Sequence, residues 1–419
     1  MMIKTLKRIA ILSCLGILSF VGMTQAQEKP PIRIGMGMAL TGPLAASGKA
    51  AYMSMQIWAE DTNLQGGLLG RKVELIAYDD QSQASNVPGI YTKLLDSDKV
   101  DLVVSGYGTN LIVPALPTIM SRKMLFFGLF GLAANSNFNY DRYFGIQPHG
   151  ENASVDMTSG FFTAAMTMSP KPQTVAIVGA DAEYPANALA GARENIKKLG
   201  LKIVYDKTYP PSTTDYSPII RAIQATNPDV VFVASYPPDS VGMIRAANEV
   251  GLKTKLFGGG MIGLGTAAVK KQLGPLLNGV LSYELYAPEP SIKFPGVNAF
   301  LKKYQARADK EGVDPLGFYL PPYAYAVMEI MGNAIKSTNS LDQKTLAEYI
   351  HSHKFSTVVG DVEFAANGEW KKGRSLYLQY RGVAGNDYEQ FRKPGKAIVI
   401  EPAFLKSGEL KYPFEDARK

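Results

Sequence analysis

Hydroxyl, glycine and tyrosine residues follow several short apolar runs of the chain, and their chemistry suits the binding of a small anion. The clearest cases come directly after the runs 101–105, 174–178 and 230–234. Backbone N–H groups near helix N-termini bind carboxylates, and tyrosine rings offer flat walls with a polar tip. We therefore expect one cleft lined from several loops. The candidates are Thr41, Ser105, Gly106, Tyr107, Gly108, Thr109, Asp181, Tyr184, Tyr236, Gly260 and Tyr286.

Residues 258–263 match a different chemistry, the G-x-G-x-x-G pattern of dinucleotide-binding turns. The pattern follows a short strand and precedes a helix, and Glu284 lies about 20 residues further on. The strand is only 255–257, the motif lies in mid-chain, and an exported protein has no secure nicotinamide supply. We expect no cofactor, and an exported α/β enzyme with a dinucleotide or acid–base site remains the alternative.

Other catalytic or metal-binding patterns are scarce. His351 and His353 could chelate a metal from one face of a strand, but they end a predicted helix, which favours a solvated pair. The carboxylates Asp79, Asp80 and Glu183 could do acid–base chemistry, although loop carboxylates are more often caps and turn residues. We expect no catalytic residue and no metal.

A regular series of elements is needed to bring these loops together. The run 32–38 is typical of a buried strand, and 47–61 has apolar residues at helical spacing. Similar pairs of apolar runs and amphipathic stretches recur up to 142–146, and a second series starts at 174–178. This alternation predicts an α/β fold with parallel sheets that are covered on both faces.

The first 26 residues have the pattern of a cleaved secretory signal. A basic start precedes the apolar run 9–23, and small residues end the segment at 24–26. The apolar run is shorter than the ~20 residues of a membrane-spanning helix. The single cysteine, Cys14, lies in this segment, and a lipoprotein signal would need it as the first mature residue. We expect cleavage after Ala26 and a periplasmic protein.

Length and charge narrow the class of protein further. A chain of 419 residues exceeds what one hydrophobic core usually serves, so two lobes are expected. The formal net charge of +7 is spread without a basic run. Nucleic-acid binding therefore has little support.

Several short motifs occur in an order that is similar to one known family. They are Ala-Leu-Thr-Gly-Pro-Leu-Ala at 39–45, Gly-Gly-Leu-Leu-Gly-Arg at 66–71, Tyr-Asp-Asp at 78–80, Tyr184, Asn-Pro-Asp-Val-Val at 227–231 and Val-Gly-Leu-Lys-Thr at 250–254. Over nearly the whole mature chain, the sequence resembles the leucine/isoleucine/valine-binding protein family, the type I periplasmic solute receptors of ABC importers.

The resemblance implies two Rossmann-like lobes with parallel central sheets joined by three hinge crossings. We expect the crossings near 146–150, 282–288 and 359–364. Lobe 1 would comprise 27–147 and 285–357, and lobe 2 would comprise 148–284 and 358–391. Residues 392–419 would form a C-terminal tail on the surface.

The resemblance also implies roles for particular residues. The loop from Ser105 to Thr109 looks like the family's clamp for a ligand carboxylate. Gly131, Leu132 and Ala133 match its second carboxylate-binding segment. Tyr184 and Tyr236 resemble the lobe-2 aromatics that close on the ligand.

One departure from the family concerns the ligand's ammonium group. Where the amino-acid receptors place an acidic residue, in the turn after Phe257, this chain has glycines at 258–260. Either another carboxylate takes over or the solute has no ammonium. The possible substitutes are Asp181, Glu183, Asp239 and Glu284.

These observations together predict a secreted, non-enzymatic solute receptor. It would bind an amino acid or a related small carboxylate or amide and deliver it to an ABC permease in the membrane. We expect a monomer. A signalling sensor module would share the fold, but it would normally be tethered, and the sequence shows no anchor.

Overall fold

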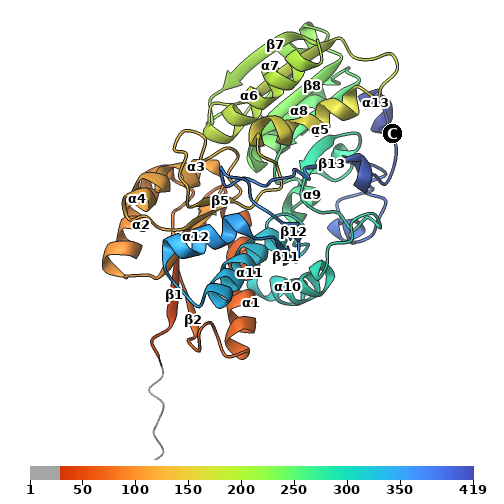
Figure 1. Ribbon diagram of the computed structural model, residues 1–419. Coiled ribbons are helices and arrows are strands. Elements are labelled where there is room, and N and C mark those ends of the chain that lie inside the picture. Colours follow the sequence, from red (N-terminus) through yellow and green to blue (C-terminus); the bar gives the residue numbers. More distant parts are fainter. Residues whose placement is uncertain (1–28) are drawn as a thin grey trace, which may run out of the picture.

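The computed structural model describes residues 29–419, which form two lobes (Figure 1). The expected signal peptide and Cys14 lie outside the described residues. Within the part that is described, no helix is long and apolar enough to cross a membrane. Figure 1 shows the green strands of lobe 2 above lobe 1, whose helices come from the orange and blue parts of the chain.

Lobe 1 is built on a five-stranded parallel sheet with the order β2-β1-β3-β4-β5. Its strands are β1 (Ile32–Met38), β2 (Val73–Asp79), β3 (Leu102–Tyr107), β4 (Phe126–Leu129) and β5 (Tyr143–Gly145). Its helices are α1 (Ala45–Leu64), α2 (Val87–Thr92), α3 (Thr109–Ile112), α4 (Leu116–Ser121), α10 (Val297–Glu311), α11 (Pro321–Thr338) and α12 (Gln343–Ser352). Every residue of β3 is buried, as expected for a strand with helices on both faces. A two-stranded ribbon of β11 (Phe355–Thr357) and β12 (Gly360–Val362) follows α12.

Lobe 2 contains a seven-stranded sheet with the order β14-β13-β10-β9-β8-β6-β7. Its strands are β6 (Thr174–Ala180), β7 (Lys202–Tyr209), β8 (Val230–Ser235), β9 (Leu256–Met261), β10 (Leu281–Glu284), β13 (Leu376–Tyr380) and β14 (Ala397–Glu401). Its helices are α5 (Ala153–Ala165), α6 (Glu183–Lys198), α7 (Ser217–Ala225), α8 (Pro237–Val250), α9 (Ala267–Leu273) and α13 (Phe414–Ala417). The strands from β7 to β10 are parallel, and β13 and β14 add an antiparallel edge.

The end of the chain differs from the expected surface tail. Strand β14 pairs with β13, and Val399 within it is fully buried. Phe414 is also fully buried, with its ring centroid 5.2 Å from that of Phe257. The Pro-rich composition of this segment gives no sign of its five-residue strand, because so short a strand is stable only as an edge of the lobe-2 sheet.

Three segments connect the lobes, and the third starts later in the chain than expected. Residues 146–152 and 285–296 form the first two crossings. Gly368 still belongs to lobe 1, because its carbonyl accepts a hydrogen bond from the N–H of Gly145 at 2.9 Å. The N–H of Arg374 donates to the carbonyl of Pro148 at 2.7 Å. The first and third crossings therefore run together, and we assign the third to 371–375 instead of 359–364.

The glycines at 258–260 correct a second expectation, because they continue strand β9 and do not form a turn. Gly258 pairs with Leu281 of β10, and a Cβ on Gly258 would lie 1.9 Å from the Leu281 carbonyl oxygen. A Cβ on Gly259 would lie 2.6 Å from the Phe232 ring. These glycines allow close packing inside the sheet and do not form the phosphate-binding turn that a dinucleotide site requires.

Alanine at position 258 should destabilise lobe 2. Gly258 has φ +147°, and the added Cβ meets backbone atoms that cannot rotate away. We expect a loss of at least about 2 kcal/mol in unfolding free energy, measured by chemical denaturation. The matched control is Gly89→Ala on α2, where a Cβ has open space and should be neutral or stabilising. Equal stability of the two variants would contradict this account of β9.

Candidate functional site

Aromatic side chains from both lobes meet between the facing edges of the two sheets. We call this group the aromatic cluster. It consists of Tyr107, Phe130, Tyr319 and Tyr323 from lobe 1, and Tyr184, Tyr236, Tyr283 and Tyr377 from lobe 2. All of its members are buried. The hydroxyls of Tyr107 and Tyr319 are 3.0 Å apart and share a hydrogen bond.

The phenols of the cluster affect one another's pKa values across the seam between the lobes. Burial raises the pKa of Tyr184 well above its usual value, and the phenols of Tyr377, Tyr236 and Tyr107 raise it further. The pKa of Tyr319 is raised in the same way by burial and then by Tyr107. The phenols are therefore neutral at physiological pH and act as hydrogen-bond donors and acceptors.

In lobe 1, the hydroxyls predicted to clamp a carboxylate bind the backbone of the neighbouring loop. The Ser105 hydroxyl accepts from the N–H of Leu129 at 2.6 Å, and Thr109 accepts from the N–H of Leu132 at 3.0 Å. Gly108 has φ +95° and passes directly beneath the Tyr236 ring, whose hydroxyl would lie 3.5 Å from a Cβ at this position. The role of this loop as a ligand clamp stays a prediction.

In lobe 2, Tyr184 and Tyr236 stand at the starts of α6 and α8 and face each other with ring centroids 5.5 Å apart. The Tyr184 hydroxyl donates to the Gly260 carbonyl at 2.7 Å. The Tyr236 hydroxyl approaches the backbone N–H of Asn110 but has no hydrogen-bond partner within residues 29–419. A buried hydroxyl without a hydrogen-bond partner is costly, so the Tyr236 hydroxyl is free to bond a polar group of a ligand.

Direct contacts between the lobes surround the cluster. The Asn187 side chain on α6 donates to the Leu132 carbonyl at 2.8 Å. The N–H of Tyr184 donates to the Asn110 side-chain oxygen at 3.4 Å. The structure therefore has the lobes closed on each other at this edge.

The remaining sequence-derived candidates lie around the cluster at different distances. The Thr41 hydroxyl lies in an exposed turn and donates to Asp79 at 2.6 Å. Asp181 is exposed, and Gly131 packs on the Tyr143 hydroxyl. Tyr286 donates to Asn298 at 3.4 Å. The structure thus brings the residues from Ser105 to Thr109, Leu132, Tyr184, Tyr236 and Gly260 together, and it places Thr41 and Asp181 at the surface.

Of the four carboxylates considered for an ammonium group, two have close partners. Asp239 accepts from the hydroxyls of Tyr209 and Tyr216 at 3.2 and 3.3 Å, and burial raises its pKa. Glu284 accepts from the Tyr380 hydroxyl at 2.6 Å, and burial raises its pKa to about 7.

The other two carboxylates, Asp181 and Glu183, have exposed side chains. Glu183 lies near enough to Tyr236 to raise the pKa of that phenol. It is therefore the one of the four that combines proximity to the cluster with a carboxylate open to water.

The described residues, 29–419, include the two histidines that were considered as metal ligands. No group of three or more His, Cys, Asp or Glu side chains could hold a metal ion there. His351 bonds the Asp141 carbonyl at 2.9 Å, and His353 stacks on Tyr349 with ring centroids 3.8 Å apart.

Sequence reasoning missed five of the eight members of the aromatic cluster. Phe130, Tyr283, Tyr319, Tyr323 and Tyr377 come from a loop, two strands and the start of α11, and nothing in their spacing links them. The one usable signal was the Pro-Pro pair that begins α11, because proline in the first turn marks the start of a helix just after Tyr319.

Comparisons with known proteins agree with this architecture. The family described as periplasmic binding protein matches residues 31–379. A Leu/Ile/Val-binding protein homolog of Brucella suis is 27% identical over 400 residues, which are 90% of this chain and 94% of the relative.

Two solved structures share the fold. One is the branched-chain amino acid transporter substrate binding protein LivJ of Streptococcus pneumoniae in complex with isoleucine, with a TM-score of 0.72, 18% identity, and coverage of 89% of this chain and all of LivJ. The other is a solute binding protein of an ABC transporter from R. palustris in complex with benzoate. Its TM-score is 0.71 at 15% identity, and the match covers 88% of this chain and 95% of that protein.

Removing the Asn187 side chain should loosen the contact between the lobes. The Asn187→Ala variant loses one hydrogen bond across the seam, a loss of about 0.5–1.5 kcal/mol. We expect a larger radius of gyration by small-angle X-ray scattering, and the control Asn137→Ala changes an exposed residue of the lobe-1 loop. If both variants scatter like the parent protein, this hydrogen bond does not hold the lobes together.

Proposed function

The chain belongs to the periplasmic binding protein family, and we propose that it is the extracytoplasmic substrate-binding protein of an ABC transporter. In this proposal it holds an amino acid or a related small carboxylate or amide between its lobes. The observation that carries the proposal is the aromatic cluster, to which both lobes contribute buried phenols around the Tyr236 hydroxyl.

The arrangement suits a receptor that closes on its ligand. The two sheets are connected only through the three crossings, and the other interlobe contacts are side-chain contacts that can separate. Hinge motion is the usual response to a ligand in such an architecture. A solute that touches both lobes would stabilise the closed arrangement by its differential affinity for it.

We further propose that the protein works in the periplasm as a monomer and passes its solute to a membrane permease. Export would depend on the signal in residues 1–26. The chain would not be an enzyme, a view supported by the hydrogen bonds of three carboxylates: Asp79 accepts from Thr41, Asp239 from two tyrosines and Glu284 from Tyr380.

The class of solute follows from the charges near the cluster. An ammonium group that leaves water needs an anionic partner, because an unpaired buried charge costs several kcal/mol. Glu183 is exposed, and the other candidate carboxylates are exposed or already bonded. Phenol hydroxyls, in contrast, can donate to a carboxylate or an amide. We therefore propose that the solute does not require an ammonium group, so that carboxylates and amides, aromatic ones included, compete with branched-chain amino acids.

A thermal-shift screen over amino acids, aromatic acids, dicarboxylates and amides tests the proposed function. A ligand present at ~100 times its dissociation constant adds about 2.7 kcal/mol of apparent stability. Leucine and its deaminated analogue, 4-methylpentanoate, should then bind with similar affinity in a calorimetric titration. A strong preference for leucine would contradict the proposed solute class and point to Glu183 as the ammonium partner.

The Tyr236 hydroxyl should contribute to solute binding and not to folding. Because this hydroxyl has no hydrogen-bond partner within residues 29–419, Tyr236→Phe should unfold at the same or a higher temperature than the parent. Affinity for the solute found in the screen should fall by about 0.5–1.5 kcal/mol. Tyr205→Phe on β7 is the matched control and should leave affinity unchanged. Unchanged affinity in Tyr236→Phe would remove this hydroxyl from the site.

A further inference from the structure

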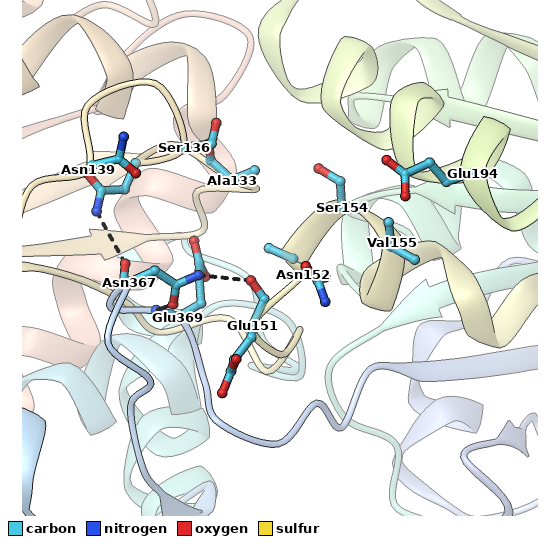
Figure 2. A pocket seen from close by; sticks show the side chains of 12 residues that line it. Ala133, Ser136, Asn139, Glu151, Asn152, Ser154, Val155, Glu194, Asn367 and Glu369 are labelled. Atoms are coloured by element: carbon cyan, nitrogen blue, oxygen red, sulfur yellow. Dashed lines mark hydrogen bonds between the residues drawn. The ribbon is translucent and has the colours of Figure 1, made fainter.

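A pocket lies at the seam between the lobes, beside the first and third crossings (Figure 2). Its volume is about 350 Å³. Figure 2 shows Ser136, Asn139 and Glu369 on the lobe-1 side of a gap and Ser154 and Glu194 on the lobe-2 side. We call it the hinge-side pocket. None of the aromatic cluster lines it, although Ala133, which the resemblance places in the solute site, is one of its lining residues.

Glu369 is the unusual residue of this pocket. Its side chain lines the pocket while the residue is only 3% exposed, and its Oε2 atom has no hydrogen-bond partner in the described part of the chain. Gly145 leaves room for it, because a Cβ there would lie 2.8 Å from Oε2. The neighbouring Tyr143 hydroxyl is also without a partner. A buried carboxyl oxygen without a hydrogen-bond partner is costly and therefore points to an absent partner.

The charges around the pocket are of one sign. The ionisable side chains that line it are Glu151, Glu194 and Glu369, and no basic side chain is among its lining residues. In Figure 2 the Glu151 side chain points away from the gap, whereas Glu194 faces it. Serine and asparagine side chains supply further oxygen atoms. The chemistry that complements these walls is a cation that carries N–H donors.

The size and spread of the acceptors favour an organic cation over a metal ion. Among residues 29–419, no three carboxylate or imidazole groups come together as metal ligands do. The volume is about ten times the share of one water in the liquid, which suits a small molecule. We propose that the hinge-side pocket binds a small organic cation, an ammonium- or guanidinium-bearing molecule, with Glu369 as its buried partner and Glu194 across the seam.

Binding should also release a proton. Burial raises the pKa of Glu369 to about 8, so this carboxyl is mostly protonated at pH 7. A cation beside it favours the ionised form, and the proton leaves to the buffer. The other titratable groups near Glu369 are Tyr143, whose pKa burial raises well above the ordinary value, and the pocket-lining glutamates at 151 and 194. Lys371, nearby in the chain, is paired with Glu363 at 2.5 Å.

The test is a calorimetric titration of the purified protein at pH 7, without any other solute, using putrescine (1,4-diaminobutane) as the probe. We expect putrescine to bind, and 1,4-butanediol and magnesium chloride not to bind. The measured heat should depend on the ionisation enthalpy of the buffer, because one proton is released. Glu369→Gln should weaken putrescine binding about tenfold or more and abolish the buffer dependence.

Three further variants make the result decisive. Glu348→Gln removes the same charge from an exposed position of α12 and should bind putrescine like the parent. Glu194→Gln, on the surface of α6, should weaken binding severalfold and serves if Glu369→Gln fails to fold. Tyr184→Ala, which disturbs the proposed solute site, should retain putrescine.

The proposal is overturned if the parent protein does not bind putrescine, if magnesium binds instead, or if Glu369→Gln and Glu194→Gln both bind as the parent does. It is also overturned if Tyr184→Ala loses putrescine, because the probe would then occupy the aromatic cluster. Each of these results leaves the proposed receptor function to be judged separately by the solute screen.

Discussion

Buried phenol hydroxyls need hydrogen-bond partners, and in the aromatic cluster the phenols that are bonded find those partners within their own lobe. Tyr107 and Tyr319 bond each other, and Tyr184 bonds the Gly260 carbonyl. The hydroxyls of Tyr236, Tyr283 and Tyr377 have no hydrogen-bond partner within residues 29–419. The closed arrangement is therefore well packed by aromatic rings but incompletely hydrogen-bonded. That combination leaves the seam able to accept a polar ligand without losing its apolar contacts.

The positions of these tyrosines depend on the packing of the sheets behind them. The glycines of β9 allow β10 to approach closely, and they leave a bare carbonyl at Gly260 for Tyr184. A side chain at 258 or 259 would push β10 or Phe232 away. The glycine-rich stretch that resembles a nucleotide-binding motif thus serves the packing of the sheet. It affects the site because strand β9 carries the Gly260 carbonyl that Tyr184 bonds.

The hinge-side pocket and the aromatic cluster occupy different parts of one seam. Both have walls from both lobes, so the occupant of either contacts groups that separate when the lobes open. By thermodynamic linkage, a ligand that favours the closed arrangement at one place raises the affinity of a ligand that favours it at the other.

The sequence by itself determined the repeating elements and the edge of the sheets at which the candidate site residues lie. Continuous apolar strands such as 102–107 and 230–235 can only be stable between two layers of helices, so they predicted parallel sheets and placed Tyr184 and Tyr236 at strand ends. Helix α5 and strand β14 escaped prediction because their residues gain stability from neighbours distant in the chain. The tertiary structure alone decided which side chains meet across the seam, where the third crossing runs, and that Glu369 is buried beside Gly145. Those contacts join residues separated by up to hundreds of positions, and no local pattern encodes them.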